Sequence, residues 1–379
     1  MDAEIPQSVA DLIKRLQQAP QENTLQHLEE TLRVSAARRP EESAALDAAV
    51  VSLLGDRLGG ERLLECVDLE GLEALAGRAL ARLTAAGDSP RLDLRRRAWD
   101  LLDVLRRSRL LCRIAEARAT AAWASRILAL VDASHFTFGQ LFAQRAAAYS
   151  GRSLFRIPGL NETRTLTWHQ AAGRVDLIAR GLLALTEGGA GRIAILSENR
   201  LESALIDFAC LSSGLVDVMI PATATDADVA YMLSEARVGT VIASSREQLQ
   251  KVLKCRDTLP HPTTVVVLDA DASVRSVVPF EHVLERAAEV PYETLAARRH
   301  GVRIDALATV MYTSGTTGVP KGICFSNRNM VFKRFARALA MPEIGEQDVF
   351  LAYLPLFHTF GRFLELQGTV FWGATYCFA

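Results

Sequence analysis

Residues 307–329 read LATVMYTSGTTGVPKGICFSNRN, and this stretch is the most informative in the chain about its fold. An apolar run leads into residues 313–318, which hold four hydroxyl side chains and two glycines, and Lys321 follows three residues later. Glycines let the backbone approach an anion closely, hydroxyls add hydrogen-bond donors, and a lysine supplies a point charge. The pattern therefore predicts a loop for the phosphates of a nucleoside triphosphate. It lies between two strands, and a helix capped by Ser326 or Asn327 follows.

Two alternative interpretations of this loop carry less weight. The P-loop pattern GxxxxGK[ST] places Gly directly before Lys, whereas here Pro320 precedes Lys321 and Gly322 follows it. A P-loop NTPase is therefore disfavoured. Surface turns rich in Ser, Thr and Gly are common, but this string, with its strand before it and its lysine at the end, is longer than chance provides.

The string YTSGTTGVPKG (312–322) resembles the signature of the adenylate-forming superfamily, which includes acyl-CoA synthetases, luciferases and the adenylation domains of peptide synthetases. Three further segments resemble elements of the same family: LTW at 166–168, SENR at 197–200 with a helix and Gly214 behind it, and YLPLFH at 353–358. The resemblance covers about residues 136–379.

The resemblance implies a two-step ligase reaction. A carboxylate attacks the α-phosphate of ATP, and a thiol, usually that of coenzyme A, then displaces AMP. The residues implied in binding ATP are Thr313, Ser314, Gly315, Thr316, Thr317, Gly318 and Lys321. The resemblance also implies that Thr313 is a ligand of Mg²⁺, which prefers hard oxygen ligands, and that Lys321 and His358 are catalytic. Because the first step brings two anions together, such a site must neutralise charge and hold the phosphates in line.

His358 lies after an expected strand, between Phe357 and Phe360. A histidine in such a setting often packs in a core, but in this family it is the residue that faces the carboxylate and the acyl chain. LPLFHTFGR (354–362) is similar to the version in long-chain fatty acyl-CoA synthetases, which implies a long-chain fatty acid as the substrate. Five aromatic residues could line an acyl tunnel or fill a core, and both interpretations stay open. They are Phe357, Phe360, Phe363, Phe371 and Trp372.

The chain is expected to contain an all-helical domain (1–132) of unknown role and an α/β domain (133–379). Before residue 132, apolar residues recur at helical spacing, and residues 91–131 contain neither Pro nor Gly. After it, short β-rich runs alternate with helical runs, which is typical of a layered α/β fold with a mainly parallel sheet. The expected strands are 192–197, 216–220, 240–243, 264–268, 308–312 and 349–353, and the expected helices are 138–149, 201–211 and 226–235.

Residues 374–379 form an apolar run that predicts a strand at an exposed sheet edge. The resemblance places an acidic Mg²⁺ ligand, an aspartate that grips the ribose and a small domain with a catalytic lysine further along, and no matching strings occur in the 379 residues. It therefore implies that the AMP-binding domain is incomplete at its C-terminus and that this chain alone forms no acyl-CoA.

Composition narrows the function classes. Hydrophobic residues make up 49% of the chain and charged residues 23%, which excludes wholesale disorder. Lys plus Arg number 43 and Asp plus Glu 44, so no basic surplus favours nucleic acid. The arginine clusters at 95–97 and 106–107 are interpreted as a solvated helix face that nearby aspartates offset.

The location and partners follow from what the sequence lacks. It has no CxxC unit and no apolar leader, and Asp207 and Asp217 interrupt the most apolar stretch, 204–221, so no transmembrane helix is predicted. A cytoplasmic location is expected, with room for peripheral membrane contact, and the N-terminal helices could dock a protein partner. Two other functions stay open: transfer of the acyl group to a carrier protein, and a non-catalytic module that binds a nucleotide or an acyl-adenylate.

Overall fold

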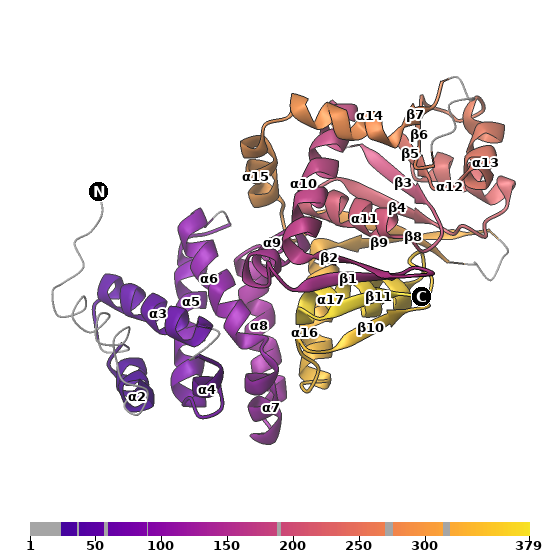
Figure 1. Cartoon of the computed structure of the whole chain (residues 1–379). Helices are drawn as coiled ribbons and strands as arrows, with labels where there is room; N and C mark the ends of the chain where they lie inside the picture. Colours follow the sequence, from indigo (N-terminus) through magenta and orange to yellow (C-terminus); the bar gives the residue numbers. More distant parts are fainter. Residues whose placement is uncertain are drawn as a thin grey trace. The chain divides into compact units, whose positions relative to one another are not determined.

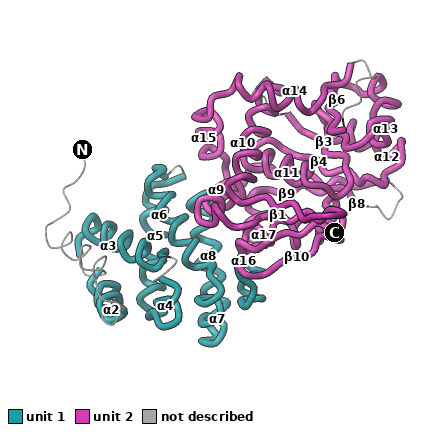
Figure 2. The backbone as a smooth tube through the Cα atoms, viewed as in Figure 1, with its two compact units in different colours: residues 1–136, 335–345 teal, residues 137–334, 346–379 magenta. Residues whose placement is uncertain are grey.

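The computed structural model of the chain describes residues 24–35, 38–56, 60–88, 90–187, 191–269, 276–313 and 319–379. The chain divides into two compact units (Figure 2). Unit 1 comprises residues 1–136 and 335–345, and unit 2 comprises residues 137–334 and 346–379.

Unit 1 is built from helices in its described part (Figure 1). They are α2 (Thr24–Ser35), α3 (Pro40–Gly55), α4 (Gly60–Leu64), α5 (Leu69–Ala85), α6 (Leu92–Leu105), α7 (Ser108–Glu116) and α8 (Thr120–Ala133). Apolar side chains three or four residues apart face the core, as in α5, where Leu72, Leu75 and Ala76 are buried. The expected helical character of this region is confirmed.

Residues 91–131 fold as three helices although they contain neither Pro nor Gly. The chain leaves the helical conformation after Leu105 and again after Glu116. Arg118 has a left-handed φ of 54°, and the backbone N–H groups of Arg118 and Ala119 bond back into α7 as in a Schellman motif. A single left-handed residue, which the sequence pattern did not indicate, therefore ends this helix.

The arginine pair 106–107 is buried, which corrects the expectation of a solvated face: the two residues are 4% and 7% exposed. Arg107 donates to the backbone oxygens of Leu54 and Gly55 at 3.3 and 2.7 Å. Glu61 pairs with the same guanidinium at 3.0 Å. Because the last carbonyl groups of a helix lack intrahelical partners, this side chain satisfies the end of α3.

A seven-stranded sheet forms the centre of unit 2 (Figure 1). Its order is β7-β6-β5-β3-β4-β8-β9, and every neighbouring pair is parallel except β8 with β9. The strands are β3 (Arg192–Leu196), β4 (Val216–Ile220), β5 (Thr240–Ala243), β6 (Thr264–Val267), β7 (Val278–Pro279), β8 (Leu307–Thr313) and β9 (Lys321–Ser326). Strands β3 to β6 and β8 are short, β-branched and largely buried, as parallel strands covered by helices are. The expected α/β fold is confirmed.

Helices cover both faces of this sheet. On one face, α12 (Asp226–Glu235) and α13 (Arg246–Arg256) bury apolar side chains against alternate strand residues. On the other, α11 (Leu201–Ser213) packs against β3 and β4 and is buried at every residue except Glu202. The remaining helices are α9 (Phe138–Ala148), α10 (Trp168–Leu185), α14 (Phe280–Glu285), η1 (Arg286–Glu289), α15 (Tyr292–Gly301), α16 (Asn327–Ala340), which has residues in both units, the π-helix η2 (Phe360–Leu366) and α17 (Gln367–Trp372).

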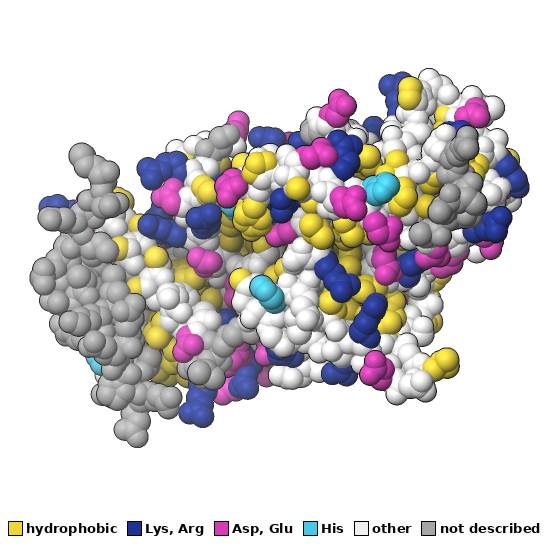
Figure 3. All heavy atoms as spheres, turned by 45° about the horizontal axis from the view of Figure 1, so that its top comes forward, with side chains coloured by type: hydrophobic (Ala, Val, Ile, Leu, Met, Phe, Trp, Pro, Cys, Tyr) yellow, Lys and Arg dark blue, Asp and Glu magenta, His cyan; other side chains and the backbone are white. Residues whose placement is uncertain are grey.

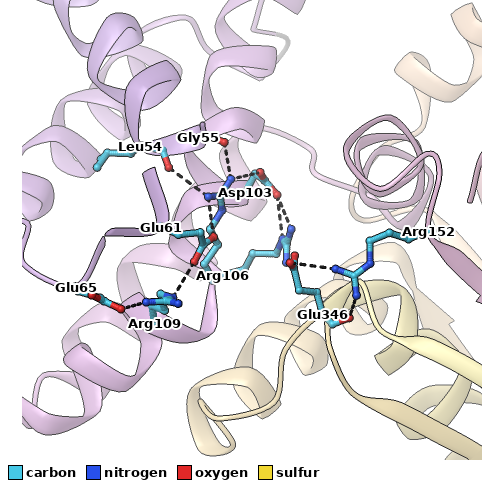
Figure 4. Close-up of polar contacts among 10 residues, drawn as sticks. Leu54, Gly55, Glu61, Glu65, Asp103, Arg106, Arg109, Arg152 and Glu346 are labelled. Atoms are coloured by element: carbon cyan, nitrogen blue, oxygen red, sulfur yellow. Dashed lines mark hydrogen bonds and ion pairs between the residues drawn. The ribbon is translucent and has the colours of Figure 1, made fainter. Parts of the chain in front are cut away.

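A second sheet of unit 2 has the order β10-β11-β1-β2. Its strands are β1 (Ser153–Pro158), β2 (Thr163–Thr167), β10 (Val349–Ala352) and β11 (Thr375–Phe378). Strand β11 is parallel to both β10 and β1, and Tyr376 is fully buried. The expectation of an exposed edge at 374–379 is therefore wrong, because the partner strand β1 lies more than two hundred residues earlier in the sequence. Next to the first residues of β1 and β10, Arg152 pairs with Glu346 at 3.0 Å (Figure 4).

Positively and negatively charged side chains are mixed on the surface (Figure 3), in keeping with the near-equal numbers of the two in the sequence. Figure 3 shows Lys and Arg interspersed with Asp and Glu on the face that it draws. In the 95–97 cluster, Arg96 and Arg97 are exposed, as expected for a solvated helix face.

Candidate functional site

The YTSGTTGVPKG string (312–322) connects two strands that form an antiparallel hairpin. Thr313 ends β8, Lys321 begins β9, and the two are register partners. Both are exposed. Five predicted site residues lie outside the described residues: Ser314, Gly315, Thr316, Thr317 and Gly318. The structure therefore brings the two ends of the expected loop together at the edge of the seven-stranded sheet.

Tyr312 connects the loop end of this hairpin to α12. Its hydroxyl donates to the Glu235 carboxylate on α12 and lies 3.3 Å from the backbone oxygen of Met232. Burial raises the pKa of the Tyr312 phenol well above its usual range, and the Glu235 carboxylate adds to the shift. A Cβ at Gly322 would lie 3.3 Å from the Tyr312 ring, so the two strands meet closely here. The ends of the loop are thus tied to α12.

The hairpin is followed by α16, whose first turn is capped as expected. The Ser326 hydroxyl accepts from the backbone N–H of Asn329 at 3.3 Å, and the Asn329 side chain accepts from the backbone N–H of Ser326 at 3.0 Å. This reciprocal arrangement satisfies N–H groups that a helix start leaves unpaired. It fixes where β9 ends.

His358 lies in the turn between β10 and η2 and is exposed, which excludes a packed core histidine. Its ring stacks on Phe360 with centroids 6.0 Å apart, and its Nδ1 accepts from the Phe360 backbone N–H at 3.4 Å. The imidazole is therefore accessible to a substrate. Two contacts join the segment that begins at His358 to the hairpin strands: Phe363 meets Phe325 of β9 edge to face at 5.0 Å, and Arg362 bonds to Thr309 of β8.

Arg362 is a fully buried guanidinium held by two aspartates. It donates to Asp207 at 2.6 and 3.1 Å, to Asp217 at 2.6 Å and to the hydroxyl of Thr309 at 2.6 Å. Asp217 on β4 and Thr309 on β8 are register partners, so adjacent strands present both acceptors to one side chain. Burial raises the pKa of the Asp217 carboxyl well above its usual range, although Arg362 opposes the shift.

Sequence reasoning missed this cluster, although one signal was present. Asp207 and Asp217 interrupt the most apolar stretch of the chain. A carboxylate in a buried strand or helix needs a partner, because an unpaired buried charge is very costly. The two aspartates therefore pointed to a cation, but nothing in the local sequence named Arg362.

Three of the five aromatic residues considered for an acyl tunnel fill the core of unit 2. Phe363, Phe371 and Trp372 are 2%, 0% and 3% exposed. Phe360, in contrast, is 54% exposed beside His358. The core interpretation is therefore correct for these three residues.

The described residues contain little that could hold a metal ion. Within them, no three Asp, Glu, His or Cys side chains are grouped to ligate one. Thr313 offers one hydroxyl oxygen, which suits Mg²⁺ but is a single ligand. In the same part of the chain, no helix combines the length and the apolar character needed to cross a membrane.

Comparison with known proteins gives consistent matches. A family profile described as AMP-binding enzyme matches residues 142–379. The long-chain-fatty-acid–CoA ligase ACSBG1 of Rattus norvegicus is 27% identical over 249 residues, which are 64% of this chain and 34% of the rat protein. The long-chain-fatty-acid–CoA ligase FadD15 of Mycobacterium bovis is 29% identical over 202 residues, or 53% of this chain and 33% of that protein. The chain thus spans about a third of the length of these relatives.

A solved structure supports the fold. The anthranilate CoA ligase AuaEII, in complex with anthranoyl-AMP, superposes with a TM-score of 0.56 at 20% identity. The superposition covers 64% of this chain and 44% of that one.

Proposed function

This chain belongs to the family of AMP-binding enzymes, and from this premise we propose that the whole protein is an ATP-dependent ligase that converts a long-chain fatty acid to acyl-adenylate and then to acyl-CoA. One observation carries the proposal: the β8–β9 hairpin presents Thr313 and Lys321 at the two ends of the YTSGTTGVPKG string. The relatives named above are long-chain-fatty-acid–CoA ligases, which supports the choice of acid.

In the first step, a carboxylate oxygen attacks the α-phosphorus of ATP. The bond from that phosphorus to the oxygen bridging to the β-phosphate breaks, and pyrophosphate leaves. Lys321 is exposed at the start of β9, and its ammonium group would bind the β- and γ-phosphates and neutralise the leaving group. In the second step, the deprotonated thiol of coenzyme A attacks the acyl carbonyl carbon, and AMP leaves.

His358 and Thr313 have supporting roles in this proposal. The exposed imidazole of His358 would hold the carboxylate in line with the α-phosphorus, which reduces the entropic part of the barrier. When bound, Mg²⁺ neutralises phosphate charge, and the Thr313 hydroxyl is the described oxygen that would ligate it.

The nucleotide site is tested by replacing Lys321. Loss of a charge-assisted phosphate contact costs about 1.5–3 kcal/mol, so Lys321→Ala should weaken ATP binding about 10- to 150-fold in calorimetry. The thermal midpoint should stay within about 2 °C, because the side chain is exposed. Lys254→Ala is the matched control, since Lys254 is also exposed and pairs with Asp226 on the neighbouring helix, away from the hairpin. Equal ATP affinity in the two variants would contradict the assignment.

The chemistry is tested with the full-length protein in a single turnover. Palmitate and ATP are mixed with excess enzyme, quenched and analysed by mass spectrometry. The proposal expects palmitoyl-AMP, and palmitoyl-CoA after coenzyme A is added. An acyl-adenylate that forms but transfers only to a carrier protein would retain the first step and reject the second.

A further inference from the structure

The segment that carries His358 folds into a turn whose two ends are each fixed by side-chain hydrogen bonds, which are partly buried at the first end and fully buried at the second. We call residues 354–362 the His358 turn. It is held at one end from β3 and at the other from α11, β4 and β8. Its own backbone adds a hydrogen bond from the N–H of His358 to the oxygen of Pro355 at 3.0 Å.

Asn199, three residues after the end of β3, fixes the first end. Its side-chain Nδ2 donates to the backbone oxygen of Leu354 at 2.8 Å, and its Oδ1 accepts from the backbone N–H of Leu356 at 2.8 Å. One carboxamide thus makes the two bonds that a neighbouring strand would make. Only a side chain with a donor and an acceptor in one plane can satisfy both groups.

Arg362 fixes the second end. Its backbone N–H donates to the backbone oxygen of His358 at 3.0 Å, and its side chain is bound to Asp207, Asp217 and Thr309. The backbone on the C-terminal side of His358 is therefore connected directly to a side chain that is fully buried. The buried cluster therefore restricts how far the backbone at Arg362 can move.

The two ends of the turn also pack closely against each other at Gly361. A Cβ at this position would lie 2.4 Å from the backbone oxygen of Pro355 and 2.6 Å from that of Leu354. Backbone meets backbone here, so no side chain can fit at position 361. The clamps at Leu354 and at Arg362 therefore act on one compact unit.

We propose that Asn199 and Arg362 are positioning residues that together set the place of the His358 imidazole. This inference rests on the proposed function, because it assumes that His358 orients the carboxylate. Both residues act indirectly, through the backbone of the turn. Asn199 holds the backbone before His358, and Arg362 holds the backbone after it. A small displacement of a positioned group lowers turnover strongly, even when folding is intact.

The first test compares Asn199→Ala with Asn327→Ala in the full-length protein. Asn327 is the control because its side-chain Nδ2 also donates to backbone oxygens, those of Arg303 and Ala306, outside the His358 turn. It is more deeply buried than Asn199, so its variant also controls for a general loss of stability. Hydrogen–deuterium exchange should rise about tenfold at peptides covering 354–362 in Asn199→Ala and stay unchanged there in Asn327→Ala. Equal exchange in the two variants would overturn the clamp.

Kinetics supply the functional readout. In palmitate-dependent exchange of pyrophosphate into ATP, Asn199→Ala should lower kcat about 10- to 100-fold and leave KM for ATP within twofold. Asn199→Asp keeps the acceptor for Leu356 but loses the donor to Leu354, so its loss should be intermediate. A loosened turn with wild-type kinetics would overturn the positioning role.

Arg362→Lys is the second variant, with Arg299→Lys as its control. Arg299 is also buried and bonds to a carboxylate, that of Asp176, away from the turn. Arg362→Lys should reproduce the kcat loss, and Arg299→Lys should not. If the wild-type protein shows no acid-dependent exchange at all, the proposed function fails and this role fails with it, even where deuterium uptake confirms the clamp.

Discussion

Replacing Arg362 with methionine should destabilise unit 2 by about 3–5 kcal/mol, because it removes one partner of a buried ion cluster and leaves the others behind. This free-energy cost is estimated from the contacts that Arg362 makes. Arg362 makes four hydrogen bonds of 2.6–3.1 Å, to Asp207, Asp217 and Thr309, and all four residues are at most 1% exposed. Methionine fills much of the volume but donates nothing, so the carboxyl groups lose their cation.

The assays are urea denaturation and thermal denaturation, both followed by circular dichroism at several pH values. A loss of 1 kcal/mol lowers the thermal midpoint of a domain of this size by about 2–4 °C, so the midpoint should fall by about 6–20 °C. The deficit should be smaller at pH 5 than at pH 8, because protonated carboxyl groups are cheaper to bury. Adding Asp207→Asn should recover at least about 1 kcal/mol, since it removes a stranded charge. A loss under about 1 kcal/mol, or one independent of pH, would refute this reasoning.

Three further outcomes are expected. Asp217→Asn should reduce the loss of stability that the wild-type protein shows as pH rises. The folded-state pKa of Asp217 is raised above its ordinary 3.8, so the folded chain binds this proton more tightly than the unfolded chain and loses that stabilisation as pH rises through the raised pKa. Identical urea midpoints at every pH in the two proteins would contradict this. Tyr312→Phe should cost about 1–2 kcal/mol in urea unfolding, because it leaves the Glu235 carboxylate without its hydroxyl donor; an unchanged midpoint would argue that the hairpin is held elsewhere. Arg107→Ala should destabilise unit 1 by about 2–4 kcal/mol, measured as lost helical signal in urea, and a cost below about 0.5 kcal/mol would show that its buried contacts contribute little.

The parts of the fold that local sequence encodes were predictable. Residues 226–235 and 240–243 form the expected helix and strand with the expected bounds. Buried strands between helices are continuous apolar runs of four or five residues, so their positions follow from the sequence alone. The string YTSGTTGVPKG was recognisable as a candidate phosphate-binding loop for the same reason, since its glycines, hydroxyls and lysine lie close together in the sequence.

The parts that depend on distant pairing were not predictable. Strand β1 lies between β2 and β11, and nothing near residue 153 or 375 indicates that these segments meet. The same is true of Arg362, whose partners Asp207 and Asp217 lie more than a hundred residues away in the chain. The expectation for 106–107 was wrong because the partners of these arginines are not evident from local charge: Arg106 pairs with Asp103, and Arg107 bonds to the end of α3 and to Glu61.

If this protein activates a carboxylate with ATP as proposed, it must exchange labelled pyrophosphate into ATP in the presence of the acid. This exchange requires the reversible formation of an acyl-adenylate, so nucleotide binding alone cannot produce it. In the full-length protein with Mg²⁺, exchange should be absent without an acid and should saturate with palmitate. It should fall at least about tenfold in Lys321→Ala. ATP binding without exchange for any carboxylic acid would contradict the account and leave a nucleotide-binding module.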